Sequence, residues 1–126
     1  MNDKLPDDNP KTRYGVKKPP VHLVPPVAVL EEAMVFQLGA HKYGPYNWRE
    51  KSISSSVYVS AAIRHIQSWQ DGQDLDDEST YSHLAHARAC LAILLDALHL
   101  DKLNDDRPAV PGKAAQFIKE VADEHG

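Results

Sequence analysis

Imidazole and carboxylate side chains gather in the middle of this sequence, around one short connection between two apolar segments. His83 and His86 are three residues apart, a spacing that places two side chains on one face of a helix. His65 belongs to the preceding apolar segment, and an acidic stretch joins the two segments. A lone helical histidine is usually an ordinary core or surface residue, and an acidic loop is usually just solvated. Their conjunction favours a functional site.

Carboxylates and imidazoles from several helices can converge on a metal ion inside a helical bundle. Carboxylate oxygens together with water favour Mg²⁺ or Mn²⁺. Zn²⁺ prefers a closed set of His and Cys ligands, for which the single cysteine, Cys90, is weak support. The candidate metal ligands are Glu31, Glu32, Asp76, Glu78, His83 and His86.

A second group of side chains has the types needed to bind an anionic, aromatic ligand. Lys and Arg hold phosphate oxygens, an aromatic ring stacks on a base, and Asn can read a base edge. An equally good interpretation of the same stretch is a loop anchored by its Tyr and Trp side chains. The candidate substrate-binding residues in this group are Lys42, Tyr43, Asn47, Trp48, Arg49 and Arg64.

Apolar residues at helical spacing predict three long helices that position these side chains. The first runs from about 27 to 41 and follows a Pro-Pro pair. The second runs from about 57 to 71, is capped by a serine within 54–56, and has apolar residues on two faces, so we expect it to be well buried. The third runs from about 81 to 100, with a wide apolar face made by Leu84, Ala87, Leu91, Leu94, Leu95 and Leu98.

We therefore expect an all-α fold: a small bundle of about three long helices in a single domain over residues 1–126, with no strands of useful length. Residues 1–20 form a Pro-rich, charged arm, in which little can be buried. The helical core covers 21–103 and begins with an extended strap over 21–26. Residues 104–126 form a polar tail with a short amphipathic helix at about 114–123. Because the apolar surface exceeds what one intramolecular contact covers, we expect a homo-oligomer, a dimer or a tetramer.

Composition excludes several classes of protein. The net charge of −4 with neutral His argues against direct nucleic-acid binding, which requires a basic face. One Cys cannot form an internal disulfide, which fits a reducing, cytoplasmic setting. The sequence has no apolar run of about 18 residues, so we expect no membrane span. The polar start of the chain is unlike a signal peptide.

Several of these stretches, in this order, resemble one known family. The set consists of 15–20 (GVKKPP), 23–26 (LVPP), 39–44 (GAHKYG), 47–48 (NW), 64–65 (RH), 69–72 (WQDG), 76–79 (DDES) and 83–87 (HLAHA). These motifs are similar to those of phage and bacterial dATP/dGTP diphosphohydrolases, relatives of the MazG-like all-α NTP pyrophosphohydrolases. The resemblance covers roughly residues 13–100.

The resemblance implies a metal-dependent enzyme, with Mg²⁺ or Mn²⁺, that converts a purine dNTP to the monophosphate and pyrophosphate. It also implies a role in phage nucleotide-pool control, which in some members serves 2-aminoadenine DNA synthesis. Lys42 and Arg64 would hold the polyphosphate, and Tyr43, Asn47 and Trp48 would position the sugar or base. The catalytic residues would be Glu31, His65 and His83.

The sequence departs from the MazG pattern of Glu-Glu-x-x-Glu on one helix and Glu-x-x-Asp on the next. Val35 stands where the third Glu would be, and His83 and His86 replace both acids of the second motif. Within the closer family, Pro stands at the place of Asp77 and Gly at the place of Thr80. The set of metal ligands therefore cannot be copied from MazG.

Two other functions remain open at this point. A hydrolase of the HD type, which releases whole triphosphate, needs an adjacent His-Asp pair, and no such dipeptide occurs here. A non-catalytic phage regulatory or scaffold module would use the histidines and acids for subunit contacts alone, and it predicts no nucleotide turnover.

Overall fold

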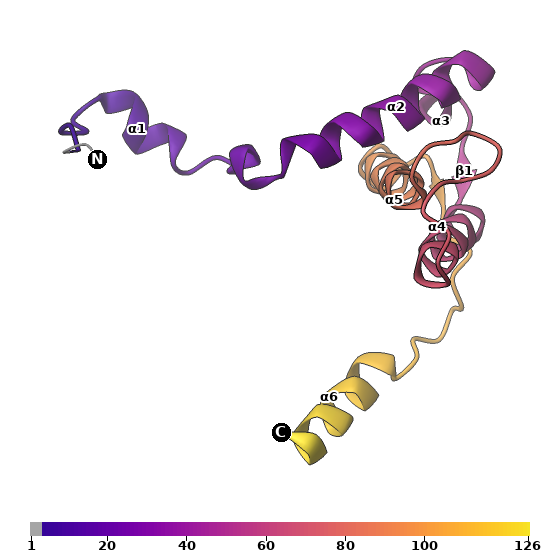
Figure 1. Ribbon diagram of the computed structural model, residues 1–126. Coiled ribbons are helices and arrows are strands. Elements are labelled where there is room, and N and C mark those ends of the chain that lie inside the picture. The colour runs from indigo at the N-terminus through magenta and orange to yellow at the C-terminus, as the bar shows by residue number, and fades with distance from the viewer. Residues whose placement is uncertain (1–3) are drawn as a thin grey trace.

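A small helical body with two projecting ends makes up this protein (Figure 1). The structure is a computed structural model and describes residues 4–126. The body consists of α2 (Pro26–Tyr43), α4 (Ser55–Gln70) and α5 (His83–His99). Helix α5 packs mainly against α4 and next against α2. The three predicted long helices are present, and the all-α fold class is confirmed.

The remaining elements are short and were only partly predicted. They are α1 (Pro10–Gly15), η1 (Val21–Leu23), α3 (Asn47–Glu50), β1 (Ile53–Ser54), β2 (Leu103–Asn104) and α6 (Ala114–His125). The predicted arm starts within residues 1–3, which lie outside the described residues, and its later part contains α1. Asn9 caps α1 by accepting a hydrogen bond from the backbone N–H of Lys11, and Pro10 begins the helix.

One prediction about regular structure was wrong, and one small element was not predicted. The segment predicted to be an extended strap contains a 3₁₀ turn, η1. The chain also has a two-stranded parallel ladder, in which Ile53 pairs with Leu103 and Ser54 with Asn104. Each strand has only two residues, too short to produce an alternating pattern in the sequence.

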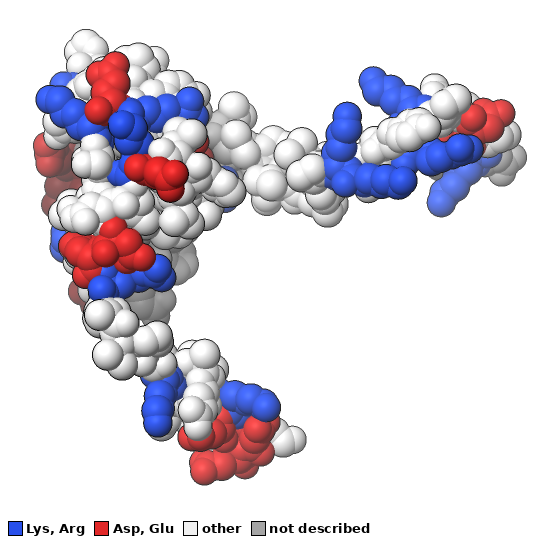
Figure 2. All heavy atoms as spheres, turned by 180° about the vertical axis from the view of Figure 1, so that it is seen from behind, with Lys and Arg blue, Asp and Glu red and all other residues white. Residues whose placement is uncertain are grey.

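Helices α1 and α6 lie away from the body, at the two ends of the chain (Figure 1). Lys and Arg side chains gather on the N-terminal arm, as Figure 2 shows. The apolar face of α6 is open, with Phe117 and Ile118 both exposed. Within residues 4–126, no helix combines the length and the apolar character that crossing a membrane requires.

Alanines form most of the buried core. Ala85 and Ala89 lie one turn apart on α5, and Ala87 lies on another face of the same helix; all three are buried. Small side chains on more than one face allow α5 to approach both of its neighbours. The leucines of the predicted apolar face are largely exposed, for example Leu95 at 61% and Leu98 at 55%. This apolar face is therefore present on α5 but is left mostly uncovered in the single chain.

Helix α4 is also less buried than predicted. Ser55 and Ala62 are its buried residues, whereas Ile63 and Ile66 are exposed. Of its two predicted apolar faces, the one with Tyr58, Ala61 and Ala62 is buried or half-buried, and the one with Val59, Ile63 and Ile66 is exposed. The sequence pattern indicates which side chains are apolar, but not that a single chain is large enough to cover them.

The start of α4 is held by the C-terminal segment, and not by a serine cap as predicted. Ser54 occupies the cap position without a side-chain cap hydrogen bond. Asp106 instead accepts hydrogen bonds from Ser55 Oγ at 2.6 Å, from the backbone N–H of Ser56 at 2.8 Å and from Ser56 Oγ. These bonds lower the pKa of Asp106 to about 2. A carboxylate at a helix N-terminus is further favoured by the helix dipole.

We expect the contribution of Asp106 to stability to disappear in acid. Its pKa in the folded state lies below the ordinary value near 3.9, so the stabilisation is present above about pH 4 and is lost as the pH falls toward 2. Asp106→Asn should lower the urea midpoint at pH 6, and the difference from wild type should shrink by pH 3. Asp123→Asn, at an exposed position of α6, is the matched control. A difference that stays constant between the two pH values would contradict this assignment.

Candidate metal centre

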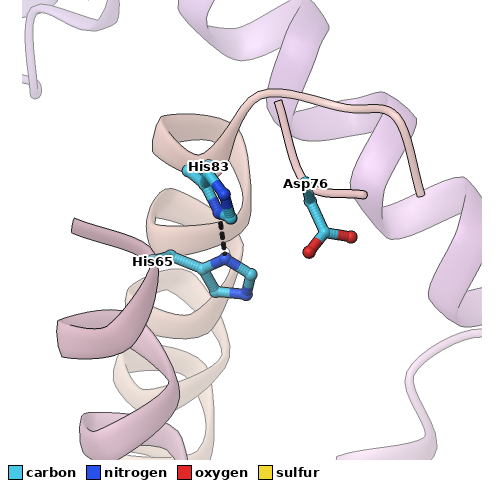
Figure 3. Close-up of side chains that lie close together, drawn as sticks. All are labelled: His65, Asp76 and His83. Atoms are coloured by element: carbon cyan, nitrogen blue, oxygen red, sulfur yellow. Dashed lines mark hydrogen bonds between the residues drawn. The ribbon is translucent and has the colours of Figure 1, made fainter. Parts of the chain in front are cut away.

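Three predicted site residues converge between α4, α5 and the loop that joins them. His65 comes from α4, His83 is the first residue of α5, and Asp76 comes from the loop (Figure 3). One ligand atom from each lies within 4.8 Å of the others. His83 is buried, with 4% of its surface exposed, and the other two are half-buried.

Local turns bring these side chains together. Helix α4 ends where Gly72 adopts φ 107°, a left-handed conformation that glycine accepts readily. The joining loop is closed by an antiparallel bridge between Leu75 and Ser82. Ser82 then caps α5, because its side chain accepts a hydrogen bond from the backbone N–H of Leu84. His83 is therefore placed at the first turn of α5, facing α4.

Both ring nitrogens of His83 have a polar partner. Its Nε2 lies 2.6 Å from Gln73 Oε1, and its Nδ1 lies 2.8 Å from Nδ1 of His65. An amide oxygen only accepts hydrogen bonds, so Nε2 of His83 carries the proton and donates to Gln73. The lone pair of His83 is thereby left on Nδ1, and the N–H of His65 Nδ1 donates to it.

Asp76 is fixed by the turn that it begins. Its Oδ2 accepts a hydrogen bond from the backbone N–H of Ser79 at 2.8 Å, and its carbonyl accepts one from Thr80. The Ser79 bonds are the main reason that the pKa of Asp76 is lowered, so the side chain is an anion at neutral pH. Thr80 has φ 64°, the left-handed region. Glycine at this place would take that conformation with less strain.

His86 borders the three residues without belonging to the same group of ligand atoms. Its ring stacks on that of His65, with centroids 4.5 Å apart, and its Nε2 lies 2.6 Å from Ser79 Oγ and 3.9 Å from Asp76 Oδ2. Burial is the largest cause that lowers the pKa of both His65 and His86. Both imidazoles are therefore neutral at pH 7, the form in which imidazole binds a metal.

Two of the predicted phosphate-binding residues lie beside this group. Lys42, in the last turn of α2, is 3.6 Å from Glu78 of the joining loop, and its charge contributes to lowering the pKa of His86. Arg64 precedes His65 on α4 and similarly contributes to the lowered pKa of His65. Arg64 also lines a shallow open pocket along α4, together with Gln67, Ser68, Gln70 and Asp71.

Trp48 lies elsewhere, as an anchor between α3 and the far half of α5. Its ring is buried, with 6% exposed, and its Nε1 donates to Asp96 Oδ2 at 2.7 Å. Arg49 donates two hydrogen bonds to the same carboxylate and stacks over Tyr46. Asp96 is ten residues beyond His86, which is about 15 Å along a helix. The anchored-loop interpretation therefore fits Trp48 well.

The other predicted residues on α2 and beside it are dispersed. Asn47 donates to the Gly44 carbonyl at 3.2 Å, and Tyr43 is largely exposed. Glu32 lies 3.0 Å from Arg88 Nε of α5, and Glu31 is exposed. Within residues 4–126, the ligand group contains none of Glu31, Glu32, Glu78 or His86. A metal-binding role for these four stays a prediction.

Two residues of the centre were not predicted. Gln73 sets the tautomer of His83, and Ser79 joins Asp76 to His86. Ser79 stands at the end of the acidic run, where a polar turn residue was visible. The role of Gln73 depends on the path of the loop after Gly72, which no sequence pattern reveals.

The donor set fits a divalent cation. Two imidazoles and one carboxylate are the three protein ligands found in many catalytic metal sites, which leave further positions for water or substrate. Gln73 and Ser79 act on the ligands themselves, as the outer partners of metal ligands do. The arrangement could therefore hold a metal ion beside cationic side chains that attract phosphate.

Comparison with known proteins identifies similar chains. A family model described as "dATP/dGTP diphosphohydrolase, N-terminal" matches residues 8–107. A dATP/dGTP diphosphohydrolase of Salmonella phage PMBT28 is 34% identical over 107 residues, which cover 82% of this chain and 36% of the relative. The chain thus spans about a third of the length of the curated relative it matches. No solved structure gives a significant match.

Proposed function

Since the chain belongs to the dATP/dGTP diphosphohydrolase N-terminal family, we propose that it is a metal-dependent hydrolase that converts dGTP, dATP or both to the monophosphate and pyrophosphate. The observation that carries the proposal is the convergence of His65, Asp76 and His83. A bound Mg²⁺ or Mn²⁺ would neutralise charge that develops on the phosphates and help to activate water. Such an enzyme would act in the cytoplasm of a phage-infected cell and adjust the purine dNTP pool, including the supply for 2-aminoadenine DNA.

The residues of this chain have distinct roles in the proposed reaction. His65, Asp76 and His83 would hold the metal. The triphosphate would take the place of Glu78 as the partner of Lys42, because a triphosphate carries more negative charge than a single carboxylate. Arg64 would contact the same phosphates from α4. A water molecule attacks the α-phosphorus, pyrophosphate leaves, and neutral His86 can accept the water's proton.

The test of the reaction is product analysis. The full chain is incubated with each of the four dNTPs, with Mn²⁺, with Mg²⁺ and with chelator, and the products are separated by ion exchange. We expect dGMP or dAMP together with pyrophosphate, and no product when chelator is present. Release of whole triphosphate would favour the HD-type chemistry. Absence of turnover with every dNTP would favour the non-catalytic module and overturn the proposal.

We further propose that a second copy of the chain covers the exposed leucines of α5. Over residues 4–126, the buried core consists mostly of alanine, and no large apolar side chain is completely buried. A body with so thin a core is stabilised when another subunit covers its apolar faces.

The mass of the protein in solution tests this assembly. Size-exclusion chromatography with light scattering should show a dimer or a tetramer. Leu95→Glu places a charge on the exposed face of α5 and should shift the mass toward the monomer. Leu5→Glu, in the exposed arm, is the matched control and should leave the mass unchanged. A monomeric wild-type chain at the same concentration would contradict this assembly.

A further inference from the structure

We propose that the centre selects a transition-metal ion, from Mn²⁺ to Zn²⁺, over Mg²⁺, and that Gln73 enforces this choice by holding His83 in the tautomer that coordinates through Nδ1. The inference rests on the proposed function for its metal dependence and goes beyond it in the identity of the metal and in the role of Gln73.

The preference for a transition metal follows from the donor atoms of the centre. Mg²⁺ keeps several water molecules and binds proteins through one or two carboxylates, so imidazole nitrogen is a poor ligand for it. Imidazole suits the later first-row metals. Here two imidazole rings face each other, with their Nδ1 atoms 2.8 Å apart, and the group holds only one carboxylate. A site for Mg²⁺ would have more oxygen ligands than nitrogen ligands.

The role of Gln73 follows from the hydrogen bond that it accepts from His83. With the His83 proton held on Nε2 by Gln73 Oε1 at 2.6 Å, the lone pair on Nδ1 points toward His65 and is ready to coordinate. A partner on the outer nitrogen fixes both the tautomer and the ring orientation of a metal-bound histidine. Gln73 is thus a positioning residue, which acts through His83 and touches neither substrate nor metal.

Cobalt binding to the full chain is the direct test, because Co²⁺ gives a visible absorption spectrum that is independent of turnover. We expect one Co²⁺ for each chain, with visible bands that a 100-fold excess of Mg²⁺ does not remove and that Zn²⁺ does. His83→Ala should weaken Co²⁺ binding by more than about 100-fold, whereas His22→Ala, an exposed imidazole outside the centre, should leave it unchanged.

Gln73 is tested with two variants in the same assay. Gln73→Leu removes the acceptor and should weaken Co²⁺ binding by about 10- to 100-fold. Gln73→Glu keeps an acceptor at the same place and should retain binding within a few-fold. Equal weakening by both variants would show that the side chain matters only for folding and would overturn the tautomer role.

Two outcomes separate this inference from the proposed function. Displacement of Co²⁺ by a 100-fold excess of Mg²⁺, with dGTP turnover intact, would overturn the metal selectivity and leave the hydrolase proposal standing. Specific Co²⁺ binding without hydrolysis of any dNTP would support the site and contradict the hydrolase.

Discussion

Replacing His83 with alanine is expected to lower the turnover of dGTP and dATP by at least about 10³-fold, while helix content stays near that of wild type. The change removes one ligand atom and the hydrogen bonds to both Gln73 and His65. Activity is measured as pyrophosphate release, and helix content by circular dichroism.

Because His83 is buried, His83→Ala could lose activity by misfolding, so a second variant is needed to separate loss of the fold from loss of the reaction. Asp76→Asn has the same shape as the wild-type side chain but lacks the negative charge, so a similar loss of turnover is expected. His22→Ala should retain full activity. Turnover within a few-fold of wild type in both His83→Ala and Asp76→Asn would show that the reaction does not take place at this centre.

Loss of the Trp48 ring is expected to destabilise the protein by about 3–5 kcal/mol in Trp48→Ala. The ring is the largest buried side chain of the described core, and it packs against Phe36 and Tyr46 with centroids 5.8 and 5.4 Å away. Many single domains are stable by only about 5–15 kcal/mol, so this change could unfold a large fraction of the chain. Urea unfolding followed by circular dichroism gives the difference.

Trp48→Phe separates anchoring from substrate binding. It keeps an aromatic ring but loses the hydrogen bond from Nε1 to Asp96 and part of the buried ring surface, so the loss of stability should be smaller than in Trp48→Ala. For an anchor, KM for dGTP should change by no more than a few-fold. A rise in KM of tenfold or more with unchanged stability would instead support the sequence prediction that Trp48 positions the base.

Helix positions follow from local patterns, and for that reason they were predictable. The Pro-Pro pair and Gly44 bracket α2, and Ser82 caps α5. Burial depends on the size of the whole assembly. The leucine face of α5 was therefore recognisable as apolar, but its exposure in the single chain was visible only in the structure.

The centre shows the same division between local and long-range information. His83 and His86 were recognisable from helical spacing, and Asp76 from its place in the acidic connection. The distance of 2.8 Å between His65 and His83 depends on how α4 packs on α5. The ion pair of Glu32 with Arg88 and the anchoring of Trp48 on Asp96 likewise join residues far apart in the sequence.

Hydrolysis of dGTP in H₂¹⁸O, with Mn²⁺ present, tests the central claim most directly. Water attack on the α-phosphorus predicts dGMP that carries one ¹⁸O and pyrophosphate that carries none, with no product after chelation. Label in the pyrophosphate, release of whole triphosphate, or undiminished turnover in the presence of chelator would each contradict metal-dependent water attack on the α-phosphorus at a centre built on His65, Asp76 and His83.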